Sequence, residues 1–239
     1  MTQLIVEPLG DSALLIQFGA NVDEAVHAAV QAAASCLERQ AFEGFLECVP
    51  SFTTLTVYYD LEKLKRSAEH TSAFEFVRCQ VEELLKDSGA LPSDNRQIIE
   101  IPVCYGGEHG PDLSYVAEIN GLSEEEVIHI HTGQDYLVYA LGFAPGFPYL
   151  GGVPERISAP RKATPRLHIP AGSVGIAGTQ TGIYPLETPG GWQIIGRTPL
   201  ALFRPRDQPP VLVQSGQMIR FKAISTADYE RMEVDADEH

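Results

Sequence analysis

The sequence predicts an α+β protein with two domains: a small sheet with helices over residues 1–92, followed by a β-barrel over residues 93–239. Three observations predict it. In the first ninety residues, strand and helix patterns follow each other in the order ββαββα, typical of a sheet covered by helices. Residues 87–96 are polar and aperiodic and contain Gly and Pro, which favours a domain boundary. Beyond residue 132, short β-rich runs with Gly and Pro corners are typical of a closed or nearly closed barrel.

Two strands are expected at residues 3–8 and 12–18, joined by a Gly-Asp turn. A helix follows, and Asn21 is expected to cap it because Glu24 stands three residues later, as in a capping box. The apolar residues of this helix recur on one face: Val22, Val26, Val30, Ala33 and Leu37. The helix therefore has one buried side.

Residues 45–49 and 52–59 are rich in β-branched and aromatic side chains, which favours two further strands. Ser72, followed by Glu75, is expected to begin a second helix that ends at Gly89. The order of these elements predicts a small sheet with both helices on one face.

The second domain is expected to begin with a strand at residues 97–105, followed by helices at 112–119 and 123–131. Ser123 is expected to cap the second helix, whose first turn holds three glutamates that favour the positive end of the helix dipole. Strands should dominate from there on, and the acidic tail after Met232 is expected to fray.

Composition and charge exclude several classes of protein. With 17 Lys and Arg against 32 Asp and Glu, the net charge is −15, which argues against nucleic-acid and anionic-membrane partners. No apolar run approaches the roughly 18 residues of a membrane span, and no signal peptide is evident, so a cytoplasmic location is expected. Cys36, Cys48, Cys79 and Cys104 stand far apart, which predicts reduced, mostly buried thiols and no metal site.

One segment, residues 142–198, differs from the rest of the chain. Residues 142–196 hold eleven of the 21 glycines, eight of the 17 prolines and the single tryptophan. Residues 132–206 carry seven Arg or Lys against three Asp or Glu, so the surroundings are basic within an acidic protein. A basic, aromatic, turn-rich region predicts a pocket for a small anion, because the local field concentrates such ligands.

Common catalytic and nucleotide motifs are absent. No P-loop and no Rossmann fingerprint is present, so a nucleotide site would be of another type. Ser173 lies in AGSVG rather than in the G-x-S-x-G elbow, and the alternative to a nucleophile is a turn or strand hydroxyl. His131 is the other catalytic candidate, and its alternative role is that of a cation stabilised at a helix C-terminus.

The turn-rich segment also supplies candidate binding groups. Gly190 and Gly191 stand beside Trp192, so a ligand could approach their backbone N–H groups closely. Phe147 and Tyr149 could form a wall for a flat ligand or fill the core. The cations expected to bind the ligand are Arg166 and Arg197, because a guanidinium pairs with a carboxylate or phosphate through two parallel hydrogen bonds. The alternative is that both arginines tie loops together by bonding carbonyls.

Four long motifs stand in this region: GFAPGFPYLGG at 142–152, PAGSVGIAGTQTG at 170–182, IYP at 183–185 and PGGWQIIGRTP at 189–199. They resemble the KipI and allophanate hydrolase subunit 1 family, whose bacterial members include the B subunit of the ATP-dependent 5-oxoprolinase. The segment PVCYGGE from Pro102 and the position of His131 match as well. The resemblance implies a cyclophilin-like barrel after an α+β domain. The sequence departs from the usual family pattern at two positions: Thr188 stands where the family often has Ser, and Arg204 stands where Asp is common.

The resemblance implies one subunit of an ATP-hydrolysing 5-oxoprolinase, a cytoplasmic hydrolase that converts 5-oxo-L-proline to L-glutamate. It implies ATP, with Mg, as co-substrate, no metal bound by this chain, and two partners: a homologous C subunit (allophanate hydrolase subunit 2 or KipA type) and an A subunit (LamB/YcsF type). The alternatives are an inhibitor of a sensor histidine kinase and a carboxyltransferase-like part of a urea carboxylase or allophanate hydrolase system. Catalytic residues stay unknown apart from the two candidates above. The expected binding residues for substrate or nucleotide are Phe147, Tyr149, Arg166, Ser173, Gln180, Tyr184, Gly190, Gly191, Trp192 and Arg197.

Overall fold

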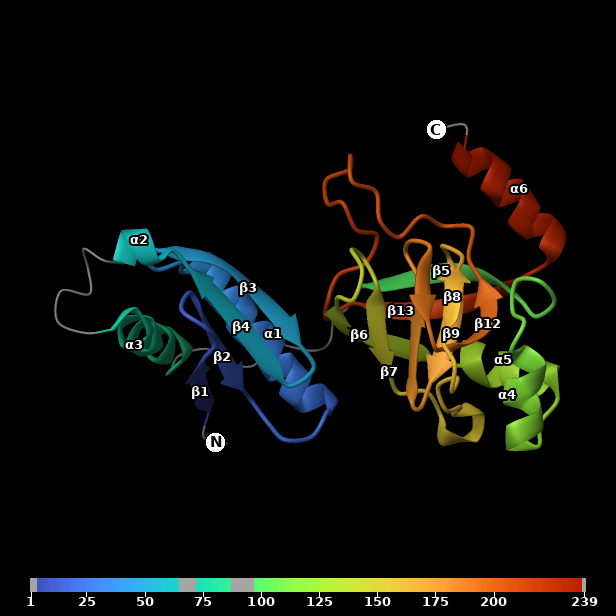
Figure 1. Ribbon diagram of the computed structural model, residues 1–239, viewed down its shortest axis with the longest axis horizontal. Coiled ribbons are helices and arrows are strands. Elements are labelled where there is room, and N and C mark those ends of the chain that lie inside the picture. Colours follow the sequence, from blue (N-terminus) through green and yellow to red (C-terminus); the bar gives the residue numbers. More distant parts are fainter. Residues whose placement is uncertain (1–3, 65–71, 87–96, 238–239) are drawn as a thin grey trace. The chain divides into compact units, whose positions relative to one another are not determined.

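The computed structural model describes residues 4–64, 72–86 and 97–237 (Figure 1). Contacts between Cα atoms divide the chain into two compact units, residues 1–95 and 96–239, and each is described by itself. The boundary expected at 87–96 and the helix end expected at Gly89 lie outside the described residues. Whether the two units fold independently stays a prediction.

The first unit contains an antiparallel sheet in the order β1-β2-β4-β3. Its strands are β1 (Ile5–Pro8), β2 (Ala13–Gln17), β3 (Phe45–Ser51) and β4 (Thr54–Tyr59). The two strands expected at the start, joined by a tight turn, are confirmed, because β1 pairs with β2. The two further strands are also confirmed, and the structure shows that they pair with each other.

Two long helices and one short helix complete this unit: α1 (Glu24–Arg39), α2 (Leu61–Leu64) and α3 (Ala73–Lys86). The expected cap at Asn21 is wrong by two residues, since the side chain of Asp23 accepts the Val26 N–H at 2.8 Å. An aspartate is as good a cap as an asparagine, and the helix begins after it. The cap at Ser72 is confirmed, because its hydroxyl accepts the Glu75 N–H at 3.2 Å.

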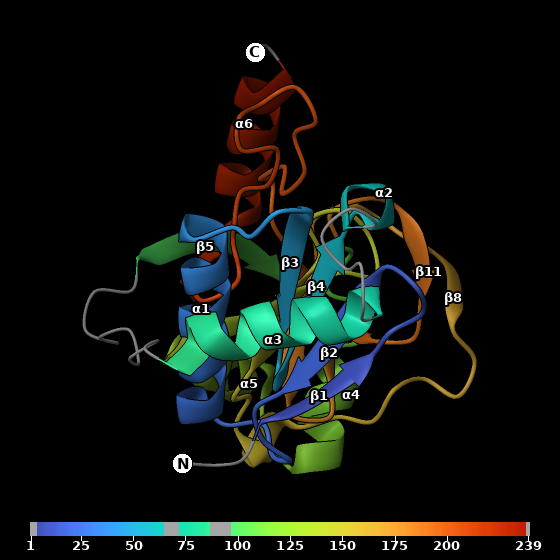
Figure 2. The same cartoon turned by 90° about the vertical axis from the view of Figure 1, so that its left-hand side faces the viewer.

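The core of the first unit lies between the sheet and the helices α1 and α3, which Figure 2 shows with the strands. Alternating residues of the central strands and the apolar stripes of both helices are fully buried there: Leu14, Ile16, Leu55, Val57, Val30, Leu37, Val77 and Val81. Val22, expected on the stripe of α1, precedes the helix and is exposed. The sheet-and-helix layer is thus held by one continuous apolar core.

The second unit is a closed barrel of seven strands among the described residues, in the order β6-β13-β5-β12-β9-β10-β7, with β7 pairing back to β6. The strands are β5 (Ile98–Tyr105), β6 (Asp135–Leu141), β7 (Pro148–Gly151), β9 (Ser173–Ala177), β10 (Gln180–Ile183), β12 (Gln193–Arg197) and β13 (Met218–Ile224). The pair β13 and β5 is parallel and the other pairs are antiparallel, so the barrel is mixed. The predicted α+β fold with a closed barrel is confirmed.

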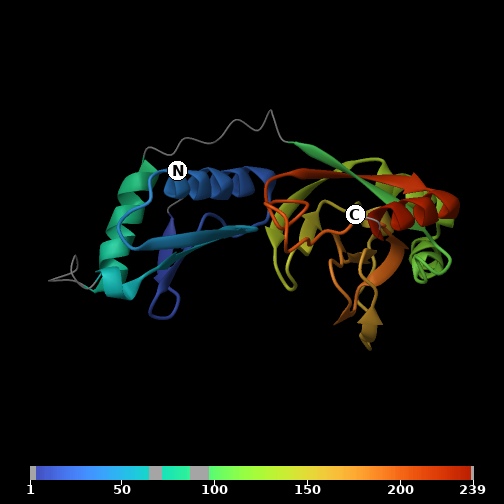
Figure 3. The same ribbon diagram turned by 90° about the horizontal axis from the view of Figure 1, so that it is seen from above.

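A separate two-stranded sheet of β8 (Arg166–Ile169) and β11 (Thr188–Gly190) projects from the barrel (Figures 2 and 3). A single 3-10 turn, η2 (Glu155–Ile157), stands between β7 and β8. Ile169 of β8 packs with Phe147, Tyr184 and Trp192 in a small apolar cluster, apart from the main barrel core. The projecting pair therefore covers an aromatic patch of the barrel.

Helices α4 (Leu113–Asn120) and α5 (Glu124–Thr132) lie together at one end of the barrel (Figure 1). The capping box at Ser123 is confirmed, with reciprocal bonds to Glu126. The expected frayed tail after Met232 is wrong for residues 233–237, because helix α6 (Thr226–Asp237) includes them; the last two residues lie outside the described ones. Within the described residues, no helix is both long and apolar enough to cross a membrane.

Candidate functional site

An aromatic hollow of about 280 Å³ opens between the barrel and the β8–β11 pair. The connection between β6 and β7 supplies Phe143 and Phe147, and β7 supplies Tyr149. The rest of the lining comes from Arg161, Pro165, Tyr184 and the run Pro189–Trp192. We call this site the aromatic hollow.

Phe147 forms the base of the aromatic hollow. It is 1% exposed, and its ring meets Tyr184 at 5.2 Å and 84° and Trp192 at 5.5 Å and 86°. Both contacts are edge-to-face, the arrangement that aromatic quadrupoles prefer. Burial raises the pKa of Tyr184 to about 12, so its phenol stays protonated. The rings are fixed by one another and offer a pre-formed apolar wall.

The two adjacent glycines of this hollow have different roles. A Cβ atom on Gly190 would lie 2.4 Å from the Tyr184 hydroxyl oxygen, so Gly190 is needed for packing. A Cβ on Gly191 would meet nothing closer than the Lys162 carbonyl oxygen at 3.7 Å, so of the two glycines only Gly191 borders open space in the hollow. The sequence could not separate these two positions.

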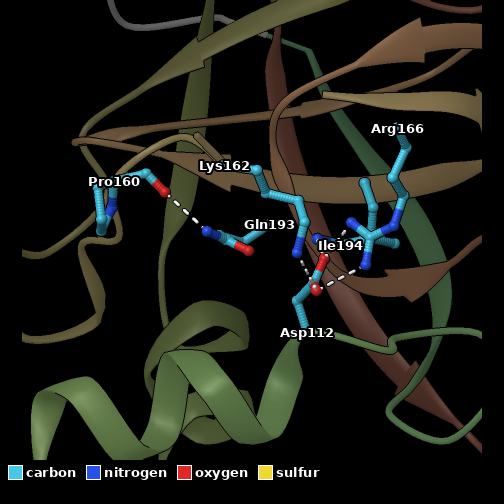
Figure 4. Close-up of polar contacts among 6 residues, drawn as sticks. All are labelled: Asp112, Pro160, Lys162, Arg166, Gln193 and Ile194. Carbon is cyan, nitrogen blue, oxygen red and sulfur yellow. Dashed lines mark hydrogen bonds and ion pairs between the residues drawn. The ribbon is translucent and has the colours of Figure 1, made fainter. Parts of the chain in front are cut away.

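The carboxylate of Asp112 is buried and forms an ion pair with two partly exposed cations (Figure 4). Arg166 donates from Nη1 to Asp112 Oδ2 at 2.6 Å and from Nη2 to Asp112 Oδ1 at 2.7 Å. Lys162 Nζ donates to Asp112 Oδ1 at 3.2 Å, and the Ile194 amide donates to Oδ2 at 2.7 Å. Burial would raise the pKa of Asp112, but the bonds from Arg166, Ile194 and Lys162 outweigh it and hold that pKa below its ordinary value. Asp112, which precedes α4, thereby anchors the first residues of β12.

A second, polar hollow of about 500 Å³ lies beside this ion pair. Its lining is Asp112, Tyr115, Arg161, Lys162, Ala163, Thr164 and Gln193. We call it the polar hollow. Arg161 lines both hollows, and its guanidinium lies 6.0 Å from the centre of the Trp192 ring.

The structure brings six of the expected binding residues to the aromatic hollow: Phe147, Tyr149, Tyr184, Gly190, Gly191 and Trp192. Neither expected cation lines it. Arg166 is engaged by Asp112, and Arg197 Nε donates to the Ala171 carbonyl at 2.8 Å, so the loop-tying alternative describes Arg197. Ser173, 2% exposed, begins β9, and Gln180 begins β10; neither is part of the lining of the two hollows.

His131 lies in the barrel interior and not at a hollow. Its Nε2 is 3.1 Å from the hydroxyl of Thr181, which itself donates to the Gly175 carbonyl. His131 Nε2 must therefore donate, and Nδ1 accepts from the Tyr105 hydroxyl at 2.8 Å. Burial lowers the pKa of His131 to about 3, so the ring is neutral and the expectation of a cation at the end of this helix is wrong. The neutral ring connects α5 with β5 and β10 through its two hydrogen bonds.

The sequence reasoning missed Asp112, Arg161, Lys162 and Gln193. Arg161 and Lys162 were visible as a basic pair in a turn next to the aromatic motifs, and this signal could have indicated them. Asp112 could be read only as the start of a helix. Within the described residues, no group of three or more His, Cys, Asp or Glu side chains could hold a metal ion.

The second unit is thus a closed mixed barrel with two hollows, and an α+β unit precedes it in the chain. The chain belongs to the carboxyltransferase domain family, subdomains C and D, which matches residues 4–213. It is 57% identical over 226 residues to the B subunit of 5-oxoprolinase from Bacillus subtilis strain 168, covering 94% of each chain. The resemblance to the KipI and allophanate hydrolase subunit 1 family is thus confirmed.

Solved structures show the same fold. The crystal structure of TTHA0988 matches with a TM-score of 0.76 and 36% identity over 92% of this chain, while this chain spans only 40% of that longer protein. The urea amidolyase of K. lactis matches with a TM-score of 0.76 over 98% of this chain. At 18% identity, and with 16% of the amidolyase covered, that match is a likeness of fold alone.

Proposed function

We propose that this chain is the B subunit of an ATP-dependent 5-oxoprolinase, which opens the lactam of 5-oxo-L-proline to give L-glutamate. The observation that carries the proposal is the 57% identity to a B subunit of 5-oxoprolinase over 94% of both chains. Identity at this level over nearly the whole chain includes the barrel, the hollows and the first unit alike.

ATP is the co-substrate because a lactam amide is a poor electrophile. Transfer of the terminal phosphoryl group of ATP to the lactam oxygen releases ADP and converts that oxygen into a leaving group. Water can then attack the activated carbon, and the C–N bond breaks as the ring nitrogen takes up a proton, which opens the ring to an acyl phosphate. A second water molecule hydrolyses this acyl phosphate to L-glutamate and inorganic phosphate. Mg accompanies the nucleotide, whose phosphates it commonly binds in such sites.

The chain acts with two partners, an A subunit together with a homologous C subunit. Its Bacillus relative is named as one subunit of the enzyme, which supports an assembly of more than one chain. The sequence contains no P-loop motif, and the described residues contain no group of His, Cys, Asp or Glu side chains that could hold a metal ion. Activity is therefore expected only from the assembly. This proposal also includes a cyclophilin-like barrel, a cytoplasmic location and independent folding of the two units. If the units fold independently, residues 96–239 produced alone should melt cooperatively.

The aromatic hollow with Arg161 is the proposed ligand site of this subunit. Its fixed rings exclude water and face a flat group, and Gly191 leaves room for a close approach to the backbone. Arg161 replaces Arg166 and Arg197 as the cation of the site, because those two are bonded within the protein. Its guanidinium suits the carboxylate of 5-oxoproline or the phosphates of ATP equally well.

The test is reconstitution. The three subunits should release ADP and form glutamate only when 5-oxo-L-proline is present, and omission of this chain should abolish both. A complete assembly without ADP release that depends on 5-oxoproline would refute the proposal. The carboxyltransferase alternative predicts biotin-dependent carboxylation instead, and the same preparation can be assayed for it.

A further inference from the structure

Gln193 lines the polar hollow and carries a buried acceptor that has no hydrogen-bond partner among the described residues. Gln193 is 3% exposed, and its Nε2 donates to the Pro160 carbonyl at 2.8 Å. That bond fixes the orientation of the amide, because only the NH2 end can face a carbonyl oxygen. The other end, Oε1, has no hydrogen-bond partner among the described residues. Buried polar atoms are rarely left unpaired, so Oε1 points to a donor supplied by a ligand.

Other acceptors of the same wall are already occupied. The two carboxylate oxygens of Asp112 accept four hydrogen bonds, from Arg166, Lys162 and the Ile194 amide. Figure 4 shows Gln193 next to this arrangement, with its amide nitrogen turned to Pro160. A donor entering the hollow therefore meets a free acceptor at Gln193 and a saturated carboxylate at Asp112.

The same hollow has cations with capacity for an anion. Among the described residues, Arg161 makes no hydrogen bond or ion pair, and its side chain is exposed. Lys162 uses one of its three Nζ hydrogens on Asp112. Its backbone N–H donates to the Gly191 carbonyl at 2.7 Å, which fixes the turn that carries both cations. Arg161 and Lys162 line the hollow together with one carboxylate, Asp112, which Arg166 also neutralises, so the hollow is positively charged.

A ligand that fits needs a carboxylate close to an uncharged N–H donor. We propose that the polar hollow is the subsite for the carboxylate and the lactam N–H of 5-oxo-L-proline, with Arg161 and Lys162 on the carboxylate and Gln193 Oε1 on the N–H. This inference rests on the proposed function. In 5-oxo-L-proline the ring nitrogen is bonded to the carbon that bears the carboxylate, so both groups point to one side of the ring.

The charge of the hollow also separates this substrate from similar molecules. The lactam N–H is neutral, whereas the nitrogen of L-proline or of the product L-glutamate carries a positive charge at neutral pH. An ammonium group beside Arg161 and Lys162 is repelled. Ring opening thus replaces the neutral lactam N–H, which Gln193 Oε1 accepts, by an ammonium group that the cations of the hollow repel. This repulsion favours release of L-glutamate. The phosphates of ATP would suit the cations but bring no donor to Gln193.

The experiment measures equilibrium binding of 5-oxo-L-proline, 2-pyrrolidone and N-methyl-5-oxo-L-proline to the three-subunit enzyme without ATP, by calorimetry. Arg161→Met should weaken 5-oxo-L-proline about ten- to hundredfold, the usual range for a charged hydrogen bond, and leave 2-pyrrolidone, which has no carboxylate, unchanged. Gln193→Ala should weaken 5-oxo-L-proline about two- to tenfold and should not weaken the N-methyl analogue, which has no N–H to donate. Arg206→Met, an exposed arginine outside both hollows, is the matched control and should change nothing.

Two failures can be told apart. If the native enzyme releases no ADP with 5-oxo-L-proline, the proposed function is wrong. If ADP release is normal but both variants bind 5-oxo-L-proline as the native enzyme does, with unchanged melting temperatures, the polar hollow is not the substrate subsite. A loss of ATP affinity with unchanged 5-oxo-L-proline affinity would assign the hollow to the nucleotide and overturn the inference.

Discussion

Removal of the Asp112 carboxylate should destabilise the second unit strongly. In Asp112→Ala the Ile194 N–H is left buried without an acceptor, and Arg166 and Lys162 lose their shared partner. Breaking a buried pair by removing one partner costs about 3–5 kcal/mol. The side chains of Arg166 and Lys162 are 28% and 31% exposed, so water can solvate them and the cost should lie near about 3 kcal/mol. A thermal melt should then fall by about 6–12 °C, at roughly 2–4 °C per kcal/mol for a chain of this size.

The matched control is the pair of Arg220 with Asp135. This pair also has two hydrogen bonds, from Arg220 Nε at 2.7 Å and from Nη2 at 2.8 Å, but the side chains of Arg220 and Asp135 are 47% and 26% exposed. Arg220→Ala should therefore change the melting temperature far less than Asp112→Ala, because solvent screens an exposed pair. Equal shifts for the two variants would show that burial of Asp112 contributes nothing, and the reasoning about the anchor of β12 would be refuted.

Two further predictions concern the aromatic hollow and the barrel core. Gly190→Ala should lower the melting temperature, because its Cβ would clash with Tyr184. Gly191→Ala should melt as the native chain does and weaken ligand binding by filling the hollow. A larger loss of melting temperature for Gly191→Ala than for Gly190→Ala would contradict the assigned roles. His131 has a pKa of about 3 in the native state against an ordinary 6.5, so the unfolded chain takes up the extra proton and stability falls as pH decreases between these values. His131→Gln should flatten this fall by up to about 1.4 kcal/mol per pH unit in denaturant titrations, and an unchanged slope would count against a neutral buried ring.

Local signals predicted most of the elements. The Ser123 capping box and the Ser72 cap are found where the sequence places them, because caps depend on residues three positions apart. At the first helix two acceptable caps, Asn21 and Asp23, compete within three residues, and only packing decides between them. Helix α6 was missed because its acidic sequence lacks an apolar stripe, although it packs against β5.

The candidate site was predicted in its aromatic part and not in its cations. Phe147, Tyr184 and Trp192 are recognisable from composition and motif, since rings gathered among turns form a wall in either role. Which arginine is free depends on where the acids lie in three dimensions. Asp112 is 54 residues from Arg166 in the chain, and no spacing rule reveals that it neutralises Arg166 and not Arg161.

The most direct test of the account compares the native three-subunit enzyme with the enzyme that contains Arg161→Met, and measures ADP and glutamate together. The native enzyme should form one glutamate for each ADP released, and only with 5-oxo-L-proline. The variant should keep the native melting temperature and require about ten- to hundredfold more 5-oxo-L-proline for the same rate, the range expected for one charged hydrogen bond. A native enzyme without coupled ADP and glutamate formation, or a variant with native kinetics for 5-oxo-L-proline, would contradict it.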